Sequence, residues 1–131
     1  LGQMLQVNVM SHFKLSKALV PFMLKGGHIV NIGSMGGVQG SVKFPGLSAY
    51  SASKAALHVL TECMALELAE YNIKVNCLAL GSVQTEMLEE AFPGYQSPVM
   101  AFEMGAYVAD FALNASKFYN GKIIPLSVTT P

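Results

Sequence analysis

The chain is organised around one stretch, Ser48-Ala49-Tyr50-Ser51-Ala52-Ser53-Lys54-Ala55-Ala56-Leu57. This stretch predicts the start of a helix, with small residues around Tyr50 and Lys54. Four residues make about one helical turn, so these two side chains project from the same face. A tyrosine normally releases its proton near pH ~10, and a lysine ammonium held close to it favours the phenolate. Such a pair can therefore exchange a proton with a substrate nearer neutral pH.

The spacing alone leaves a second interpretation open, in which a tyrosine and a lysine simply lie exposed on a helix surface. The 131 residues contain five tyrosines and eight lysines. Chance then gives roughly 0.3 pairs at this spacing (5 × 8/131), so the neighbouring elements must decide between the two interpretations.

A strand is expected on each side of this helix. An apolar stripe predicts that the helix covers 49–71, and the β-branched runs 28–34 and 73–80 predict buried strands. Two strands joined by a long helix form a parallel βαβ unit. Ligands of open α/β sheets bind at the carboxyl ends of the strands. Ser34 lies at one such end.

The remaining segments extend the α/β pattern. Helical periodicity over 2–25 predicts a first helix, and Asn8 is the polar exception on its apolar face. This asparagine is either exposed, bonded locally or functional. Ser97-Pro98 predicts the start of a last helix over 98–115, and 122–126 predicts a short final strand.

The composition narrows the possible partners. Hydrophobic residues make up 52% of the chain and charged residues 12%, which is about half the usual ~25% of charged residues. Buried helix faces or large subunit interfaces would explain this. Acidic and basic residues balance at eight each, and arginine is absent. Nucleic acid and anionic membrane surfaces are therefore not expected partners, and no apolar run approaches the ~18–20 residues of a membrane span.

Cysteine and histidine usage favours a cytoplasmic protein without a metal. Cys63 and Cys77 form no CxxC pair and are expected to be buried, reduced thiols. His28 has no second ligand at a workable spacing, so no metal site is expected. No signal peptide pattern begins the chain.

Four features, in order along the chain, resemble the C-terminal half of a short-chain dehydrogenase/reductase. They are Asn8 in the first helix, Ser34 ending Ile-Val-Asn-Ile-Gly-Ser, the pair Tyr50 and Lys54 in Tyr-Ser-Ala-Ser-Lys-Ala-Ala, and Val-Asn-Cys-Leu-Ala-Leu-Gly-Ser-Val-Gln-Thr-Glu-Met after the long helix. The resemblance covers essentially all 131 residues. It implies a Rossmann-type doubly wound parallel sheet, of which residues 1–131 would be the C-terminal, catalytic part of a single NAD(P)-binding domain.

The resemblance implies a role for each of four catalytic residues. Tyr50 would be the general acid in carbonyl reduction and the general base in alcohol oxidation. Lys54 would favour the phenolate and hydrogen-bond the nicotinamide ribose. Ser34 would donate to the substrate oxygen and stabilise the charge that develops there. Asn8 would hold, through its helix backbone, a water that links Lys54 to solvent.

The resemblance also implies a nicotinamide cofactor, NAD or NADP, for hydride transfer with a ketone or alcohol. The expected cofactor contacts are Tyr50, Lys54, Gly81, Val83 and Thr85. The Gly-rich turn that binds the pyrophosphate and the residue that selects NAD or NADP are not in the sequence. The 131 residues alone are therefore expected neither to bind the cofactor tightly nor to turn over.

The segment 35–47 is a glycine-interrupted loop that could line a substrate pocket or merely anchor itself to the core. The expected substrate contacts are Ser34, Met35, Phe44 and Met87. Fifteen residues separate Ser34 from Tyr50, a few more than is usual in the family, and Leu80 stands where the family usually has proline. Both departures leave the catalytic set intact.

Helices 2–20 and 49–71 pair with a second subunit in family members, so the resemblance implies a homodimer or homotetramer. Two other interpretations stay open. One is a non-catalytic relative that serves as a binding or assembly module. The other is an inactive fragment.

Overall fold

The computed structural model describes residues 1–23 and 25–128. Three parallel strands form one sheet in the order β1-β2-β3, namely β1 (Gly27–Ser34), β2 (Ile73–Leu80) and β3 (Ile123–Leu126). The α-helices are α1 (Gly2–Leu5), α2 (Ser11–Leu19), α3 (Ser48–Glu67), α4 (Glu86–Ala91) and α5 (Ala101–Asn114). The parallel α/β fold expected from the sequence is confirmed.

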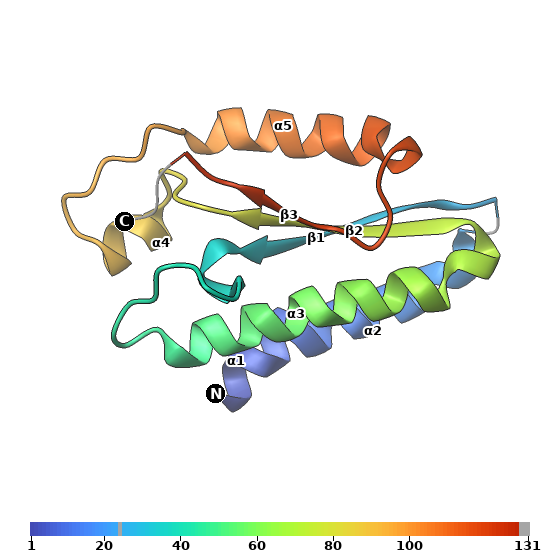
Figure 1. Cartoon of the computed structure of the whole chain (residues 1–131), viewed down its shortest axis with the longest axis horizontal. Helices are drawn as coiled ribbons and strands as arrows, with labels where there is room; N and C mark the ends of the chain where they lie inside the picture. Colours follow the sequence, from blue (N-terminus) through green and yellow to red (C-terminus); the bar gives the residue numbers. More distant parts are fainter. Residues whose placement is uncertain (24, 129–131) are drawn as a thin grey trace.

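The helices cover both faces of the sheet. Figure 1 shows α1, α2 and α3 along one face and α5 along the other, while α4 lies near the carboxyl ends of the strands. The strand β2 is buried as expected, with five consecutive buried residues from Val75 to Ala79. The strand β1 is less buried than expected, because most of its residues are only half-buried. This three-layer arrangement leaves the carboxyl edge to the loops and to the short helix α4.

The register of the strands aligns their carboxyl ends. β1 and β2 pair from Gly27 with Ile73 to Ser34 with Leu80. β2 and β3 end on the pair Leu80 and Leu126. Because the three ends coincide, the segments that follow each strand gather at one edge of the sheet.

The first helical segment is less regular than its periodicity predicts. A π-helical turn, Gln6–Met10, separates α1 from α2, and Asn8 lies in the middle of this turn. A 3₁₀ turn that contains Pro21 ends the helical segment at Phe22 instead of residue 25. Leu24 lies outside the described residues. A π turn widens the backbone locally and breaks the regular ladder of the α-helix.

The predicted start of the last helix is wrong. Residues 97–100 are not helical: Ser97 N–H donates to Gln84 Oε1 (2.9 Å), Gln84 N–H donates to the Val99 carbonyl (2.8 Å), and Met100 forms an isolated parallel bridge with Gln84. The helix α5 begins three residues after Pro98. A tertiary pairing with Gln84 therefore replaces the helical start that Ser97-Pro98 favours locally.

The expectation for the cysteines holds for only one of them. Cys77, in the central strand, is fully buried, and burial raises its pKa to about 11. Cys63 is exposed, since it lies on the side of α3 that faces away from the sheet. Both thiols are free.

Two buried asparagines fasten the strands to their neighbours. Asn31 Nδ2 donates to Thr61 Oγ1 (3.0 Å), which joins β1 to α3. Asn76, which has no exposed surface, donates to His28 Nε2 (2.9 Å) and to the Tyr119 carbonyl (3.0 Å), and its Oδ1 accepts from Lys122 N–H (3.0 Å). A single amide therefore links the amino-terminal ends of β1, β2 and β3.

We expect Thr61→Val to lower the free energy of unfolding by about 1–3 kcal/mol, because the nearly buried Asn31 amide would lose its acceptor. Urea denaturation of the full-length protein measures this loss. Thr61→Ser, which keeps the hydroxyl, is the matched control and should retain the hydrogen bond. Equal losses in the two variants would show that the hydroxyl is irrelevant.

Candidate active site

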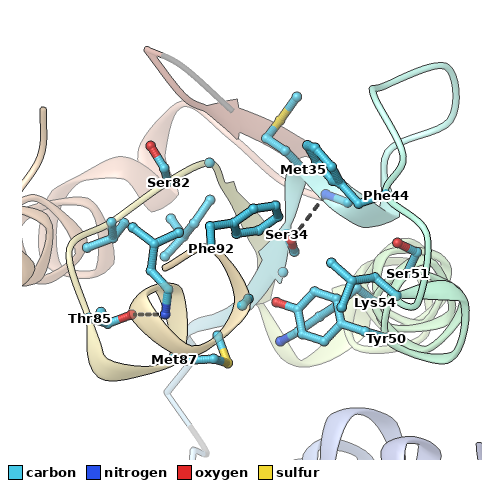
Figure 2. A pocket seen from close by; sticks show the side chains of 18 of the residues that line it. Ser34, Met35, Phe44, Tyr50, Ser51, Lys54, Ser82, Thr85, Met87 and Phe92 are labelled. Atoms are coloured by element: carbon cyan, nitrogen blue, oxygen red, sulfur yellow. Dashed lines mark hydrogen bonds between the residues drawn. The ribbon is translucent and has the colours of Figure 1, made fainter. Parts of the chain in front are cut away.

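A cavity of about 400 Å³ opens at the carboxyl edge of the sheet. Residues from the end of β1, the following loop, α3, and the segment from β2 to α4 line it (Figure 2). The structure brings together in this cavity every site residue expected from the sequence except Asn8, namely Ser34, Met35, Phe44, Tyr50, Lys54, Gly81, Val83, Thr85 and Met87.

Tyr50 and Lys54 lie one turn apart on the cavity side of α3. The Lys54 Nζ is 5.8 Å from the centre of the Tyr50 ring and donates to the Ile32 carbonyl on β1 (3.0 Å). Burial lowers the pKa of Lys54, and the nearby Cys77 opposes this effect weakly. The lysine is thus fixed between the helix and the strand, with its charge beside the phenol.

Ser34 is held where β1 ends. Its Oγ accepts the N–H of Gly36 (3.1 Å) and so caps the 3₁₀ turn Met35–Gly37. A hydroxyl that accepts one hydrogen bond can still donate its own hydrogen. Figure 2 shows Ser34 between Tyr50 and Phe92, which places a donor in the middle of the cavity.

Asn8 lies outside the cavity lining. Its Nδ2 donates to Ser53 Oγ (3.0 Å), and Ser53 Oγ donates to the Tyr50 carbonyl (2.8 Å). Asn8 is therefore half-buried and bonded to α3 immediately behind Tyr50, so it is not an exposed residue. It also makes a local contact one turn earlier, from its Nδ2 to Met4 Sδ (3.9 Å).

The segment after β2 forms the opposite wall. Thr85 Oγ1 accepts the N–H of Leu88 (3.2 Å) and caps α4, while Val83 is buried against the cavity. A Cβ at Gly81 would lie 2.2 Å from Ser127 Oγ. This close approach leaves room for glycine alone at the point where the chain leaves the sheet.

Apolar side chains dominate the rest of the lining. Phe44 from the loop and Phe92 after α4 pack edge to face, with ring centres 4.9 Å apart at 73°. Met35 and Met87 lie nearby (Figure 2). The loop 35–47 therefore lines the pocket rather than only anchoring itself, and Lys54 is the one charged side chain among the described lining residues.

His58 is a residue of this site that the sequence did not reveal. It lies under the end of β1 with 6% of its surface exposed, and the Ser34 N–H donates to its Nε2 (3.3 Å). Burial lowers the pKa of His58, and the charge of Lys54 lowers it further. Its spacing of four residues from Lys54, the same as between Tyr50 and Lys54, is a signal that could have identified it.

Two other kinds of site were examined in the described residues. No group of three or more His, Cys, Asp or Glu residues could hold a metal ion. Within the same ranges, no helix combines the length and apolar character that a membrane crossing requires.

The sequence and fold match those of known oxidoreductases. The short chain dehydrogenase family matches residues 1–96. Dehydrogenase/reductase SDR family member 4 of Bos taurus is 47% identical over 85 residues, which cover 63% of this chain and 29% of the relative. The 3-oxoacyl-[acyl-carrier-protein] reductase FabG of Thermotoga maritima is 40% identical over 88 residues, which cover 66% of this chain and 35% of that reductase.

Solved structures extend the match to nearly the whole chain. Acetoin dehydrogenase YohF of Salmonella typhimurium has a TM-score of 0.77 and 32% identity over 95% of this chain, but only 52% of its own chain. A 7α-hydroxysteroid dehydrogenase solved with NADH has a TM-score of 0.78 and 28% identity over 92% of this chain and 51% of its own. The RhlG of Pseudomonas aeruginosa, solved with NADP, has a TM-score of 0.77 and 28% identity over 94% of this chain and 54% of its own.

The chain thus spans about half the length of these structures and about a third of the curated relatives. The family match covers well over half of the 131 residues, and the parallel sheet and its edge cavity agree with it. The chain belongs to the short-chain dehydrogenase/reductase family.

Proposed function

We propose that the protein is an NAD(P)-dependent oxidoreductase that interconverts a ketone and an alcohol, with Tyr50 as the general acid and base. The observation that carries this proposal is that Ser34, Tyr50 and Lys54 line one cavity at the carboxyl edge of a parallel sheet. A serine hydroxyl, a phenol and an ammonium are the groups that carbonyl reduction needs for orienting the oxygen and moving a proton.

In this proposal each residue has a separate task. Ser34 donates a hydrogen bond to the substrate oxygen, so that the oxygen faces Tyr50. Tyr50 gives its phenolic proton to that oxygen in reduction and takes it back in oxidation. Lys54 stabilises the phenolate that remains, because its ammonium lies over the edge of the same ring. Asn8, bonded to α3 through Ser53, holds the helix at Tyr50 and supports the proton path of Lys54.

The residues of the cavity fit the nicotinamide end of a cofactor. The donor set combines the Lys54 ammonium with the backbone of the segment after β2, and Val83 supplies an apolar surface for a ring. When bound, the nicotinamide supplies or accepts the hydride. Relatives solved with NADH and with NADP support a nicotinamide cofactor without favouring either form. The residues that would hold it are Tyr50, Lys54, Gly81, Val83 and Thr85.

We propose that residues 1–131 contribute the catalytic part of a single nucleotide-binding domain and that they neither bind the cofactor tightly nor turn over alone. The support is that the chain covers about half of the solved structures it resembles. The proposed location is the cytoplasm. In the described part of the chain both cysteine thiols are free, which supports a reducing compartment.

An apolar ketone or alcohol is the substrate class that the cavity supports. Its wall contains Met35, Phe44, Met87 and Phe92, and no carboxylate lines it among the described residues. An edge-to-face pair such as Phe44 and Phe92 presents flat apolar surfaces to a ring or a chain. The chain contains no arginine that could bind a carboxylate or phosphate group of a substrate.

We also propose a homodimer or homotetramer that assembles through helices 2–20 and 49–71. Large apolar side chains on these helices are exposed in the single chain, and Ser16 is the one buried residue of α2. On α3, Val59, Cys63 and Leu66 form an exposed stripe at helical spacing. A second subunit that covers these faces would bury their apolar side chains. Such an interface would also explain the low content of charged residues in the chain.

We expect Tyr50→Phe to lower kcat by about 10²–10⁴-fold, because the general acid is lost while the ring remains. Carbonyl-dependent oxidation of NADH or NADPH by the full-length protein measures this loss, and nicotinamide fluorescence should show that the variant still binds the cofactor through its other contacts. Tyr107→Phe, on α5 outside the cavity lining, is the matched control and should keep full activity. Full activity in Tyr50→Phe would overturn the mechanism, and no cofactor binding in the wild type would favour a binding or assembly module.

We expect Phe44→Ala to raise KM for a bulky apolar ketone about tenfold, because the substrate would lose the contact area of one aromatic ring. KM for a small ketone should change less. Phe102→Ala, which removes an exposed ring of α5 that is not part of the cavity lining, is the control. Equal increases for both substrates would count against an apolar pocket.

We expect Leu66→Lys to dissociate the oligomer, because a buried ammonium would replace an apolar contact in the proposed interface. Sedimentation velocity of the full-length protein measures the change in mass. Leu113→Lys alters a leucine of nearly equal exposure on α5, across the sheet, and should leave the mass unchanged. A wild-type monomer would refute the assembly.

A further inference from the structure

His58 occupies a position directly beneath the cavity. The Ser34 N–H donates to its Nε2 at 3.3 Å, and this bond joins α3 to the last residue of β1. The ring is almost fully buried, with 6% of its surface exposed. An apolar side chain would fill this buried position equally well. The imidazole in addition accepts a hydrogen bond from the backbone N–H of Ser34, an expected catalytic residue.

The packing around the ring leaves it one orientation. A Cβ placed on Gly33 would lie 2.2 Å from His58 Nε2 and 2.6 Å from Cys77 Sγ. The imidazole therefore rests against the bare backbone of Gly33, and a larger residue there would displace it. Because Nε2 accepts, the ring hydrogen is assigned to Nδ1.

We propose that His58 is a positioning residue for Ser34, because its imidazole bonds the Ser34 N–H and so determines where the Ser34 hydroxyl lies in the cavity. This proposal rests on the proposed function, in which Ser34 orients the substrate oxygen. The backbone at Ser34 turns from β1 into the 3₁₀ turn Met35–Gly37, and His58 bonds the residue at which that turn begins. The histidine thus holds the turn to α3, the same helix that carries Tyr50 and Lys54.

The surroundings of His58 favour its neutral imidazole, the form whose Nε2 can accept the Ser34 N–H. On its own helix, Lys54 lies one turn before it and Glu62 one turn after it, and their effects on its pKa oppose each other. From β2, the Cys77 thiol has a pKa raised to about 11 and is neutral at physiological pH. On α2, His12 has a pKa lowered by burial and by the same Lys54. Burial and Lys54 together lower the pKa of His58.

Protonation of His58 would disrupt this arrangement. A proton on Nε2 removes the acceptor of the Ser34 N–H and adds a second cation near Lys54. The unfolded chain binds this proton near pH ~6.5, while the folded chain binds it at a lower pH. The stabilising contribution is therefore complete above about pH 6.5 and is lost as the pH falls toward the lower, folded pKa.

A double-mutant cycle tests whether His58 acts through Ser34. We expect His58→Leu in the full-length protein to lower kcat for carbonyl reduction about tenfold, with KM changed less than about twofold. In a Ser34→Ala background, the same change should lower kcat by less than about twofold, because the group being positioned is absent. Equal losses in both backgrounds, or no loss in either, would overturn the proposal.

Two control variants separate positioning from general destabilisation. Thr61→Val removes a buried hydrogen bond one turn further along α3 and should lower Tm without lowering kcat. His58→Gln keeps an acceptor that does not titrate, so it should retain kcat within about twofold and lose the acid limb of the kcat profile in the reduction direction. An unchanged acid limb in His58→Gln would count against the proposal.

An NMR titration tests the hydrogen bond between Ser34 and His58 independently of enzyme activity. The amide resonance of Ser34 should shift with the same midpoint as the His58 ring, and the shift should vanish in His58→Gln. An inactive wild type whose Ser34 amide follows His58 would overturn the proposed function alone. An active wild type whose Ser34 amide ignores His58 would overturn the positioning proposal alone.

Discussion

The parallel pairing of three strands in a common register is the constraint on which the rest of the structure depends. Ser34, Leu80 and Leu126 occupy equivalent positions at the ends of their strands. Each following segment must therefore leave the sheet at the same edge, whatever its own sequence. The cavity is the space between these segments, and α3 closes it because a right-handed crossover returns the chain along one face of the sheet.

The helical period of α3 brings three functional side chains to this edge of the sheet. Tyr50, Lys54 and His58 follow one another at four-residue intervals, so they form a row that runs from the cavity to the space beneath β1. Lys54 bonds the Ile32 carbonyl and His58 bonds the Ser34 N–H, so two consecutive turns of the helix are attached to the end of the same strand. The phenol and the serine hydroxyl thereby share one rigid support.

Sequence reasoning could identify elements whose local and tertiary preferences agree. The strands and α3 have strong apolar patterns, and the row of motif residues indicated which side chains share the cavity. It failed where tertiary contacts decide the local structure. Hydrogen bonds to Gln84 keep residues 97–100 out of the helix, and a π turn surrounds Asn8. The four-residue spacing from Lys54 hinted at His58, but its position depends on the missing side chain of Gly33, which lies 25 residues away in sequence (58 − 33) and adjacent in space.

The Asn76 amide has a consequence for how this fold can vary. Both of its donors and its oxygen are used to join the strand β2 to His28 of β1 and to the segment that leads into β3, at the end of the sheet opposite the cavity. The strands are thus joined through one buried side chain at the end opposite the cavity, while the segments that follow β1 and β2 line the cavity at the other end. Such a division lets the loops around the cavity vary without a loss of strand alignment. New specificities can then arise at one pole of the sheet while the opposite pole preserves its architecture.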